Sequence, residues 1–198
     1  MTRPSEEAAP RRPALVIVCG APGTGKTTLA RHLAARLAYT ILTKDDLKEA
    51  LADELGAGDR EWSKQLGRMA YELLFTRARD LLTAGKPVIV EANFHRDASD
   101  AALRGLAEYG DAVVIECVCD PATRRRRFAE RGERGERHRV HLDGEILLHE
   151  WSDEVSGFAI DIGCPRMVVD TSVGQVTSLS EIEAFASGRS IRDTVTDG

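Results

Sequence analysis

A glycine-rich turn between an apolar run and a helical pattern is the feature that most constrains this chain. Residues 16–30 read VIVCGAPGTGKTTLA, and residues 20–27 match the pattern G-x-x-x-x-G-K-[ST] in full. Glycines let successive backbone N–H groups turn toward one anion, and the following helix start adds a partial positive charge. The sequence therefore predicts a loop that holds a nucleoside triphosphate. The predicted binding residues are Gly20, Ala21, Pro22, Gly23, Thr24, Gly25, Lys26, Thr27 and Thr28.

Two side chains of this loop have predicted chemical roles. Lys26 is expected to reach the β- and γ-phosphates of ATP, and the Thr27 hydroxyl is expected to ligate Mg²⁺. Three uses of the bound phosphate are open at this point: transfer to another molecule, hydrolysis that drives motion, and sensing of the nucleotide.

The spacing of apolar residues predicts an α/β fold. Strand-length apolar runs cover residues 14–19, 87–91, 112–118 and 166–170, with a weaker one at 39–42. Helical patterns cover residues 26–37, 45–55, about 60–84, 97–109, 121–131, 143–155 and 180–186. Such alternation is typical of a three-layer sandwich with a parallel sheet and right-handed crossovers. We expect one domain over residues 13–188, a flexible leader at 1–12 and a flexible tail at 189–198.

Composition limits the partners and the location. The net charge is −5, so a nucleic-acid role needs a local basic patch. No window approaches the roughly 20 apolar residues of a membrane span, and residues 1–12 lack the apolar segment of a secretory signal. Cys117 and Cys119 have no second pair nearby that would complete a metal site. We expect a reduced cytoplasmic protein away from membranes, a monomer or a homodimer.

Acidic residues follow two of the predicted strands. In LTKDDLK, residues 42–48, Asp45 stands where a helix begins, either as a helix-capping residue or as the acceptor of a proton from an attacking hydroxyl. Lys48, one turn later, could orient that acceptor. In VIVEANFHR, residues 88–96, Glu91 leaves its strand at the same sheet edge and could hold Mg²⁺ or contact the acceptor. Asn93 could add a contact.

An arginine-rich segment follows the fourth predicted strand. Eight arginines lie between Arg124 and Arg139, which suits a lid at about residues 124–142 that closes over the triphosphate. Arg127, Arg131 and Arg137 are the predicted catalytic arginines, and the others are expected on the surface. A nucleic-acid patch is the alternative, weakened by the lack of interleaved aromatic residues. His138 and His141 are expected to make polar lid contacts.

With these segments in view, the chain resembles the small P-loop kinases that phosphorylate a hydroxyl group. The resemblance covers about residues 14–171. The group includes chloramphenicol phosphotransferase, phage polynucleotide kinase, the zeta toxins, gluconate kinase and many proteins called AAA family ATPases. It implies a five-stranded parallel sheet of order 2-3-1-4-5 with a helical lid after the fourth strand.

The resemblance also implies roles for single residues. Lys44-Asp45-Asp46 lines up with a basic-Asp-Asp triplet whose first aspartate is the general base of polynucleotide kinase-like enzymes. Lys48 stands where a basic residue contacts the acceptor region. Glu91 takes the place of an aspartate in the third-strand motif. A hexameric motor would need an apolar run that ends in Asp-Glu, whereas this run ends in a single Glu.

These features together predict an ATP-dependent phosphotransferase with an alcohol group as acceptor, on a small metabolite or an antibiotic. Catalysis is assigned to Lys26, Asp45, Arg127, Arg131 and Arg137; substrate binding to Lys48, Glu91 and Asn93; and Mg²⁺ binding to Thr27 and Glu91. The alternatives are a polynucleotide 5′-hydroxyl kinase, an acceptor-free regulatory NTPase and a nucleotide sensor.

Overall fold

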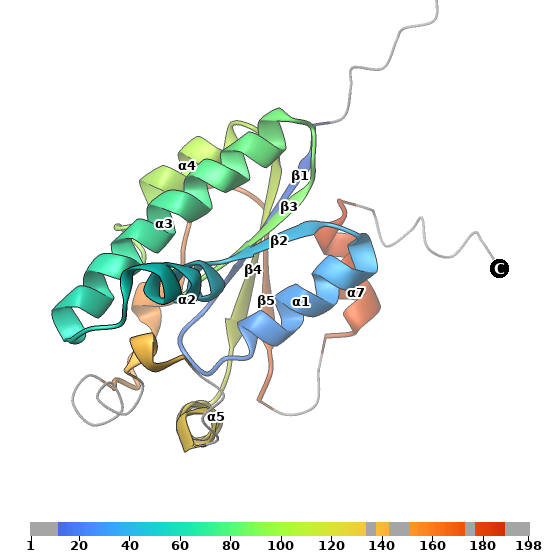
Figure 1. Ribbon diagram of the computed structural model, residues 1–198. Coiled ribbons are helices and arrows are strands. Elements are labelled where there is room, and N and C mark those ends of the chain that lie inside the picture. Colours follow the sequence, from blue (N-terminus) through green and yellow to red (C-terminus); the bar gives the residue numbers. More distant parts are fainter. Residues whose placement is uncertain (1–11, 134–137, 143–150, 173–176, 189–198) are drawn as a thin grey trace, which may run out of the picture.

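Five apolar segments pair into one parallel sheet (Figure 1). The computed structural model describes residues 12–133, 138–142, 151–172 and 177–188. The strands are β1 (Ala14–Cys19), β2 (Thr40–Thr43), β3 (Val88–Glu91), β4 (Asp111–Val118) and β5 (Arg166–Asp170). Their order across the sheet is β2-β3-β1-β4-β5, and every neighbouring pair is parallel. The predicted α/β class and the sheet order 2-3-1-4-5 are confirmed.

The central strand β1 is buried from both faces because it is apolar at every position. Val16 lies opposite Ile89 of β3 on one side and Val113 of β4 on the other. Side chains alternate between the two faces of a strand, so Ile17 packs in one core and Val18 in the other. This burial on both faces is typical of parallel sheets covered by helices.

Two helical layers cover the sheet (Figure 1). Helices α1 (Lys26–Leu37) and α7 (Leu179–Ala186) pack on one face, and α3 (Arg60–Thr83) and α4 (Asp100–Ala107) on the other. Helix α3 has an apolar stripe at helical spacing, and its buried members include Leu66, Ala70, Leu74, Ala78 and Leu82. None of the helices among the described residues combines the length and apolarity needed to cross a membrane.

The remaining elements gather at the carboxyl edge of the sheet. Helix α2 (Lys44–Leu55) begins directly after β2, and α5 (Pro121–Glu133) begins three residues after β4. The short 3-10 helices η1 (Arg139–His141) and η3 (Ser156–Phe158) lie after α5 in the described part of the chain. Ligand sites of open parallel sheets form at this edge, so these elements determine the chemistry.

Two predicted helices differ from the structure. The helix predicted over residues 97–109 forms only as α4, because Asp97 has a φ of 65° in the left-handed region. Of the helix predicted over residues 143–155, residues 151–155 are not helical, and 143–150 lie outside the described residues. The predicted tail at 189–198, and the predicted leader except Arg12, also lie outside them.

Two neighbouring leucines of α3, Leu73 and Leu74, give a test of this packing. Leu74 is fully buried between α3 and the sheet, whereas Leu73 is 37% exposed. We expect Leu74→Ala to lower the free energy of unfolding by about 2–5 kcal/mol, because it leaves a cavity in the core. Leu73→Ala, the matched control, should cost under about 1 kcal/mol. Urea denaturation followed by circular dichroism measures both, and equal losses would contradict this packing.

Candidate active site

The phosphate-binding loop lies between β1 and α1 and takes its shape from glycine. Gly20 has a φ of 139° and Gly23 a φ of 86°, and Gly25 caps α1 in the left-handed region. A Cβ at Gly20 would stand 2.3 Å from the carbonyl oxygen of Cys117, and one at Gly23 2.6 Å from that of Arg124. Only glycine fits these two positions, so the loop backbone lies directly against the end of β4 and against α5.

The next two loop residues meet a buried carboxylate. Lys26 Nζ donates to the carbonyl oxygen of Ala21 at 3.4 Å and lies 3.9 Å from Glu91 Oε1. Thr27 Oγ1 donates to Glu91 Oε2 at 3.1 Å. Glu91 ends β3 with 3% of its surface exposed, and this burial raises the pKa of its carboxyl group, with Lys26 opposing the shift.

The predicted Mg²⁺ ligands therefore lie side by side. The Thr27 hydroxyl and the Glu91 carboxylate are hard oxygen donors of the kind that Mg²⁺ prefers, and both lie beside the first turn of α1. The chemistry of this donor pair fits the ion. Among the described residues, no group of three or more His, Cys, Asp or Glu side chains could hold a metal by itself.

The two aspartates at the start of α2 point to different surroundings. Asp45 Oδ1 lies 3.3 Å from Lys44 Nζ and 3.9 Å from His141 Nδ1. Asp46 pairs with Arg31 at 3.1 Å, and its side chain is 56% exposed. Asp45 lines a cavity together with Lys26, whereas Asp46 does not. The structure thus distinguishes the two carboxylates, which the sequence places next to each other.

That cavity is where most of the predicted site residues meet. It has a volume of about 170 Å³ and draws its lining from the phosphate loop, α2, α3, the end of β3, α5 and η1. Six of its residues were predicted: Pro22, Lys26, Asp45, Lys48, Asn93 and Arg131. Four others were not assigned to a site by the sequence: Lys44, Arg60, Phe128 and His141. Lys44 belongs to the Lys-Asp-Asp triplet, which could have indicated it, whereas nothing in the sequence singles out Arg60.

Lys48 reaches this cavity from a buried position. Its side chain is on α2, the residue is 5% exposed, and Nζ donates to Ser63 Oγ at 2.7 Å. Ser63 in turn donates to the carbonyl oxygen of Val140 at 2.7 Å. The lysine therefore links α2 to α3 and to η1 at the cavity wall, in addition to any contact with an acceptor.

The arginines of α5 have different surroundings. Arg125 and Arg126 are exposed. Arg124 is 2% exposed, lies 4.5 Å from the Trp151 ring and pairs with Asp153 at 3.5 Å, so it stabilises the fold. Arg131 lies 5.2 Å from the Phe128 ring and reaches the cavity that Asp45 lines. Arg137 lies outside the described residues.

Arg127 lies in a second cavity, on the other side of the loop. Its guanidinium donates to Thr171 Oγ1 at 3.0 Å and to the Thr171 carbonyl oxygen at 2.8 Å. The cavity has a volume of about 470 Å³ and its lining is Gly25, Thr28, Leu29, His32, Arg127, Val169, Thr171 and Leu179. Apolar walls with one guanidinium suit the flat base of a nucleoside. Arg127 therefore lines this cavity and not the one that Asp45 lines.

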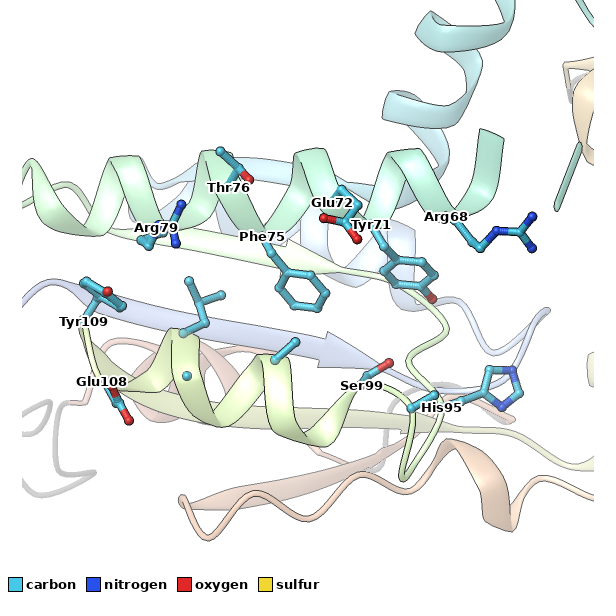
Figure 2. A pocket seen from close by; sticks show the side chains of 14 residues that line it. Arg68, Tyr71, Glu72, Phe75, Thr76, Arg79, His95, Ser99, Glu108 and Tyr109 are labelled. Carbon is cyan, nitrogen blue, oxygen red and sulfur yellow. The ribbon is translucent and has the colours of Figure 1, made fainter. Parts of the chain in front are cut away.

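A larger groove lies away from the predicted site residues. It has a volume of about 790 Å³ and lies between α3 and α4, with Tyr71 and Phe75 pointing into it from α3 (Figure 2). The Tyr71 hydroxyl donates at 3.2 Å to the carbonyl oxygen of Asn93, a residue that lines the cavity of Asp45. No residue of the phosphate loop lines this groove, and neither does Asp45.

Glu91 gives a pH-dependent test of the site. Folding raises the pKa of the Glu91 carboxyl group above its ordinary value of 4.5. The free energy of unfolding therefore falls as pH rises from 4.5 through the pKa of the folded state. Glu91→Gln removes this loss, so the variant should gain unfolding free energy relative to the native chain as pH rises above about 4.5. Urea denaturation without nucleotide measures it.

The surface control for that experiment is Glu183→Gln. His32 and Arg36 lower the pKa of the Glu183 carboxyl group, so its stabilising effect is present above the ordinary pKa and is lost as pH falls. This variant should therefore lose stability relative to the native chain as pH rises through the acid range toward about 4.5, below the range in which Glu91→Gln acts. The same sign for both variants would contradict the buried environment of Glu91.

Comparison with known proteins agrees with this geometry. A family profile of an AAA domain matches residues 15–149. A protein from Chloroflexus aurantiacus named as a candidate kinase is 31% identical, with a TM-score of 0.78 over 91% of this chain and 100% of that one. The APS kinase CysC of Mycobacterium tuberculosis, in complex with AMPPNP and APS, is 18% identical, with a TM-score of 0.55 over 88% of this chain and 95% of that one. This second likeness concerns the fold alone.

A curated relative matches a shorter stretch. The uncharacterized protein Rv2004c of Mycobacterium tuberculosis is 31% identical over 112 residues, which are 53% of this chain and 22% of that protein. This chain thus spans about a fifth of the length of that relative. The profile match covers more than half of this chain, and the sheet order and the loop agree with it. The chain belongs to the AAA domain family and has the fold of its small P-loop kinases.

Proposed function

We propose that this chain is an ATP-dependent phosphotransferase that moves the γ-phosphate of ATP to a hydroxyl group of a small metabolite or antibiotic. One observation carries the proposal: Lys26 of the phosphate loop and Asp45 of α2 line the same cavity. A kinase needs its phosphate-binding groups and its proton acceptor to face one space, whereas a nucleotide sensor has no use for the acceptor.

Each side chain has a role in the proposed reaction. The loop amides and Lys26 hold the triphosphate, and Arg127 with its apolar neighbours holds the nucleoside. Asp45 takes the proton of the acceptor hydroxyl as that oxygen attacks the γ-phosphorus, while ADP leaves on the opposite side. Arg131, in the same cavity, neutralises charge that develops on the transferred group. Mg²⁺, held by Thr27 and Glu91, would neutralise charge on the phosphate oxygens.

The size of the cavity and the small number of exposed arginines on α5 support a small acceptor. About 170 Å³ is less than the roughly 300–1,000 Å³ of pockets that enclose drug-sized ligands, so the cavity suits a small hydroxylated group. The described part of α5 exposes only two arginines, Arg125 and Arg126, which offers little charge to a polynucleotide strand. Both features favour a small hydroxylated molecule over the 5′ end of a nucleic acid.

The decisive experiment follows the label of γ-labelled ATP with Mg²⁺. It is offered alone, with nucleosides and sugar acids, with hydroxyl-bearing antibiotics, and with 5′-hydroxyl oligonucleotides. Label in a small organic product is expected, with little loss as salt rises. Label in the oligonucleotide with a steep salt dependence would assign the nucleic-acid kinase instead. Inorganic phosphate released at a rate that no acceptor changes would contradict the proposal and favour a regulatory NTPase.

The neighbouring aspartates give a matched pair of variants. Asp45→Asn should lower the transfer rate by about 10²–10⁴-fold, because the proton acceptor is lost, while ATP affinity stays near that of the native chain. Asp46→Asn, the control, should retain the native rate since Asp46 pairs with Arg31 at the surface. Lys26→Ala should weaken both transfer and ATP binding. Measured kcat and ATP affinity separate these effects, and a native rate for Asp45→Asn would remove Asp45 from its role.

A further inference from the structure

Residues 138–142 form a short segment that is fixed to α2 and α3 by several independent contacts. His138 Nε2 pairs with Asp53 Oδ1 at 3.2 Å. Val140 is 1% exposed and packs in a small core with Ala52 and Leu66, and its carbonyl oxygen accepts the hydrogen bond from Ser63. These contacts fix the segment against α2 and α3. They also fix the direction of the His141 side chain, which follows Val140 in the chain.

Helix α2 presents a row of carboxylates to this segment. Asp45, Glu49 and Asp53 are four residues apart, so they share one face of the helix. His138 meets the exposed end of the row, and His141 meets the end that lines the cavity. His141 Nε2 is 2.7 Å from Glu49 Oε1, and its Nδ1 is 3.9 Å from Asp45 Oδ1.

The geometry gives the two carboxylates different functions. The short contact to Glu49 is a hydrogen bond that orients the ring, whereas 3.9 Å exceeds a hydrogen-bond distance and allows a charge interaction only. His141 has a side-chain exposure of 4%, so little water screens that interaction. Lys44 Nζ approaches the same Asp45 oxygen at 3.3 Å. Asp45 thus has a cationic neighbour on its own helix and a titratable one on η1.

We propose that His141 is a positioning residue for Asp45: its ring, oriented by Glu49, holds the Asp45 carboxylate in the cavity. The inference rests on the proposed function, in which Asp45 is the proton acceptor. Proton removal by Asp45 then depends on the placement of residues 138–142 as well as on α2. The imidazolium form performs this role, because only a cation both donates to Glu49 and attracts Asp45.

The charges around His141 oppose one another. Asp45 and Glu49 of α2 favour its protonated form. The cationic residues that line the same cavity disfavour it, and they come from the loop, α2, α3 and α5: Lys26, Lys44, Lys48, Arg60 and Arg131. Glu49 is hydrogen-bonded to the ring at 2.7 Å and Asp45 lies 3.9 Å from it, and the proposed role belongs to the protonated ring. The transfer rate should consequently fall with rising pH as His141 loses its proton.

The first arm of the test needs no activity. NMR titration of histidine-labelled protein, with the His141 signal assigned from His141→Gln, gives the midpoint of its protonation. This midpoint should lie at lower pH in Glu49→Gln and in Asp45→Asn than in the native chain. An unchanged midpoint in Asp45→Asn would overturn the proposal, because His141 would then not sense Asp45. This result stands even if the chain transfers no phosphate.

The second arm measures transfer. His141→Gln should lower kcat by about tenfold or more with little change in the KM for ATP, and should flatten the high-pH decline. Arg139→Gln, a matched control in the same segment, should stay within about twofold of native, since the Arg139 side chain is exposed. The double variant Asp45→Asn/His141→Gln should be no slower than Asp45→Asn alone. Full additivity, or a native rate for His141→Gln, would overturn the proposal.

A further variant, Glu49→Gln, distinguishes loss of positioning from a folding defect. The Glu49 side chain is 33% exposed, so its replacement frees the ring without emptying buried space. It should lower kcat in the same direction as His141→Gln while the melting temperature stays near native. Loss of transfer in both variants with a native pH profile would indicate a structural role and would contradict positioning of Asp45.

Discussion

The fit of the phosphate loop against its neighbours is the constraint on which the rest of the site depends. The backbone at Gly20 and Gly23 approaches carbonyl oxygens of Cys117 and Arg124 so closely that no side chain can stand between them. This contact sets the distance from the loop to β4 and to α5. Lys26 and Thr27 follow one turn later, so their directions depend on the same fit, as does the placement of the arginines on α5.

Most of the fold could be predicted from the sequence because it follows from local patterns. The apolar runs of β1 and β5 and the stripe of α3 need only periodicity, and the sheet order came from the family resemblance. The helix predicted from residue 97 starts late because Asp97 adopts a left-handed conformation, which a helical pattern does not reveal. Residues 151–155 lack a helix although an apolar pattern runs into them.

The candidate site was predictable where its residues adjoin the loop or a strand end, and not where they come from distant helices. Asp45 followed from its place after β2, but its separation from Asp46 depends on Arg31 and His141, which the three-dimensional fold brings near. Arg60 enters the cavity from the first turn of α3, and its sequence surroundings resemble any exposed helix start. Counting arginines also overestimated the charge available to a ligand, since Arg124 belongs to the packed interior.

The contact of Lys26 and Thr27 with Glu91 has a consequence for selectivity among anions. Both side chains already have an internal carboxylate as partner, so an incoming phosphate competes with a group of the protein itself. A bare anion that displaced them would leave a buried negative charge unsatisfied, which is costly. A triphosphate that arrives with its divalent cation supplies a new partner for that charge. With Mg²⁺ bound as proposed, the carboxylate would therefore favour cation-loaded nucleotides over free inorganic phosphate.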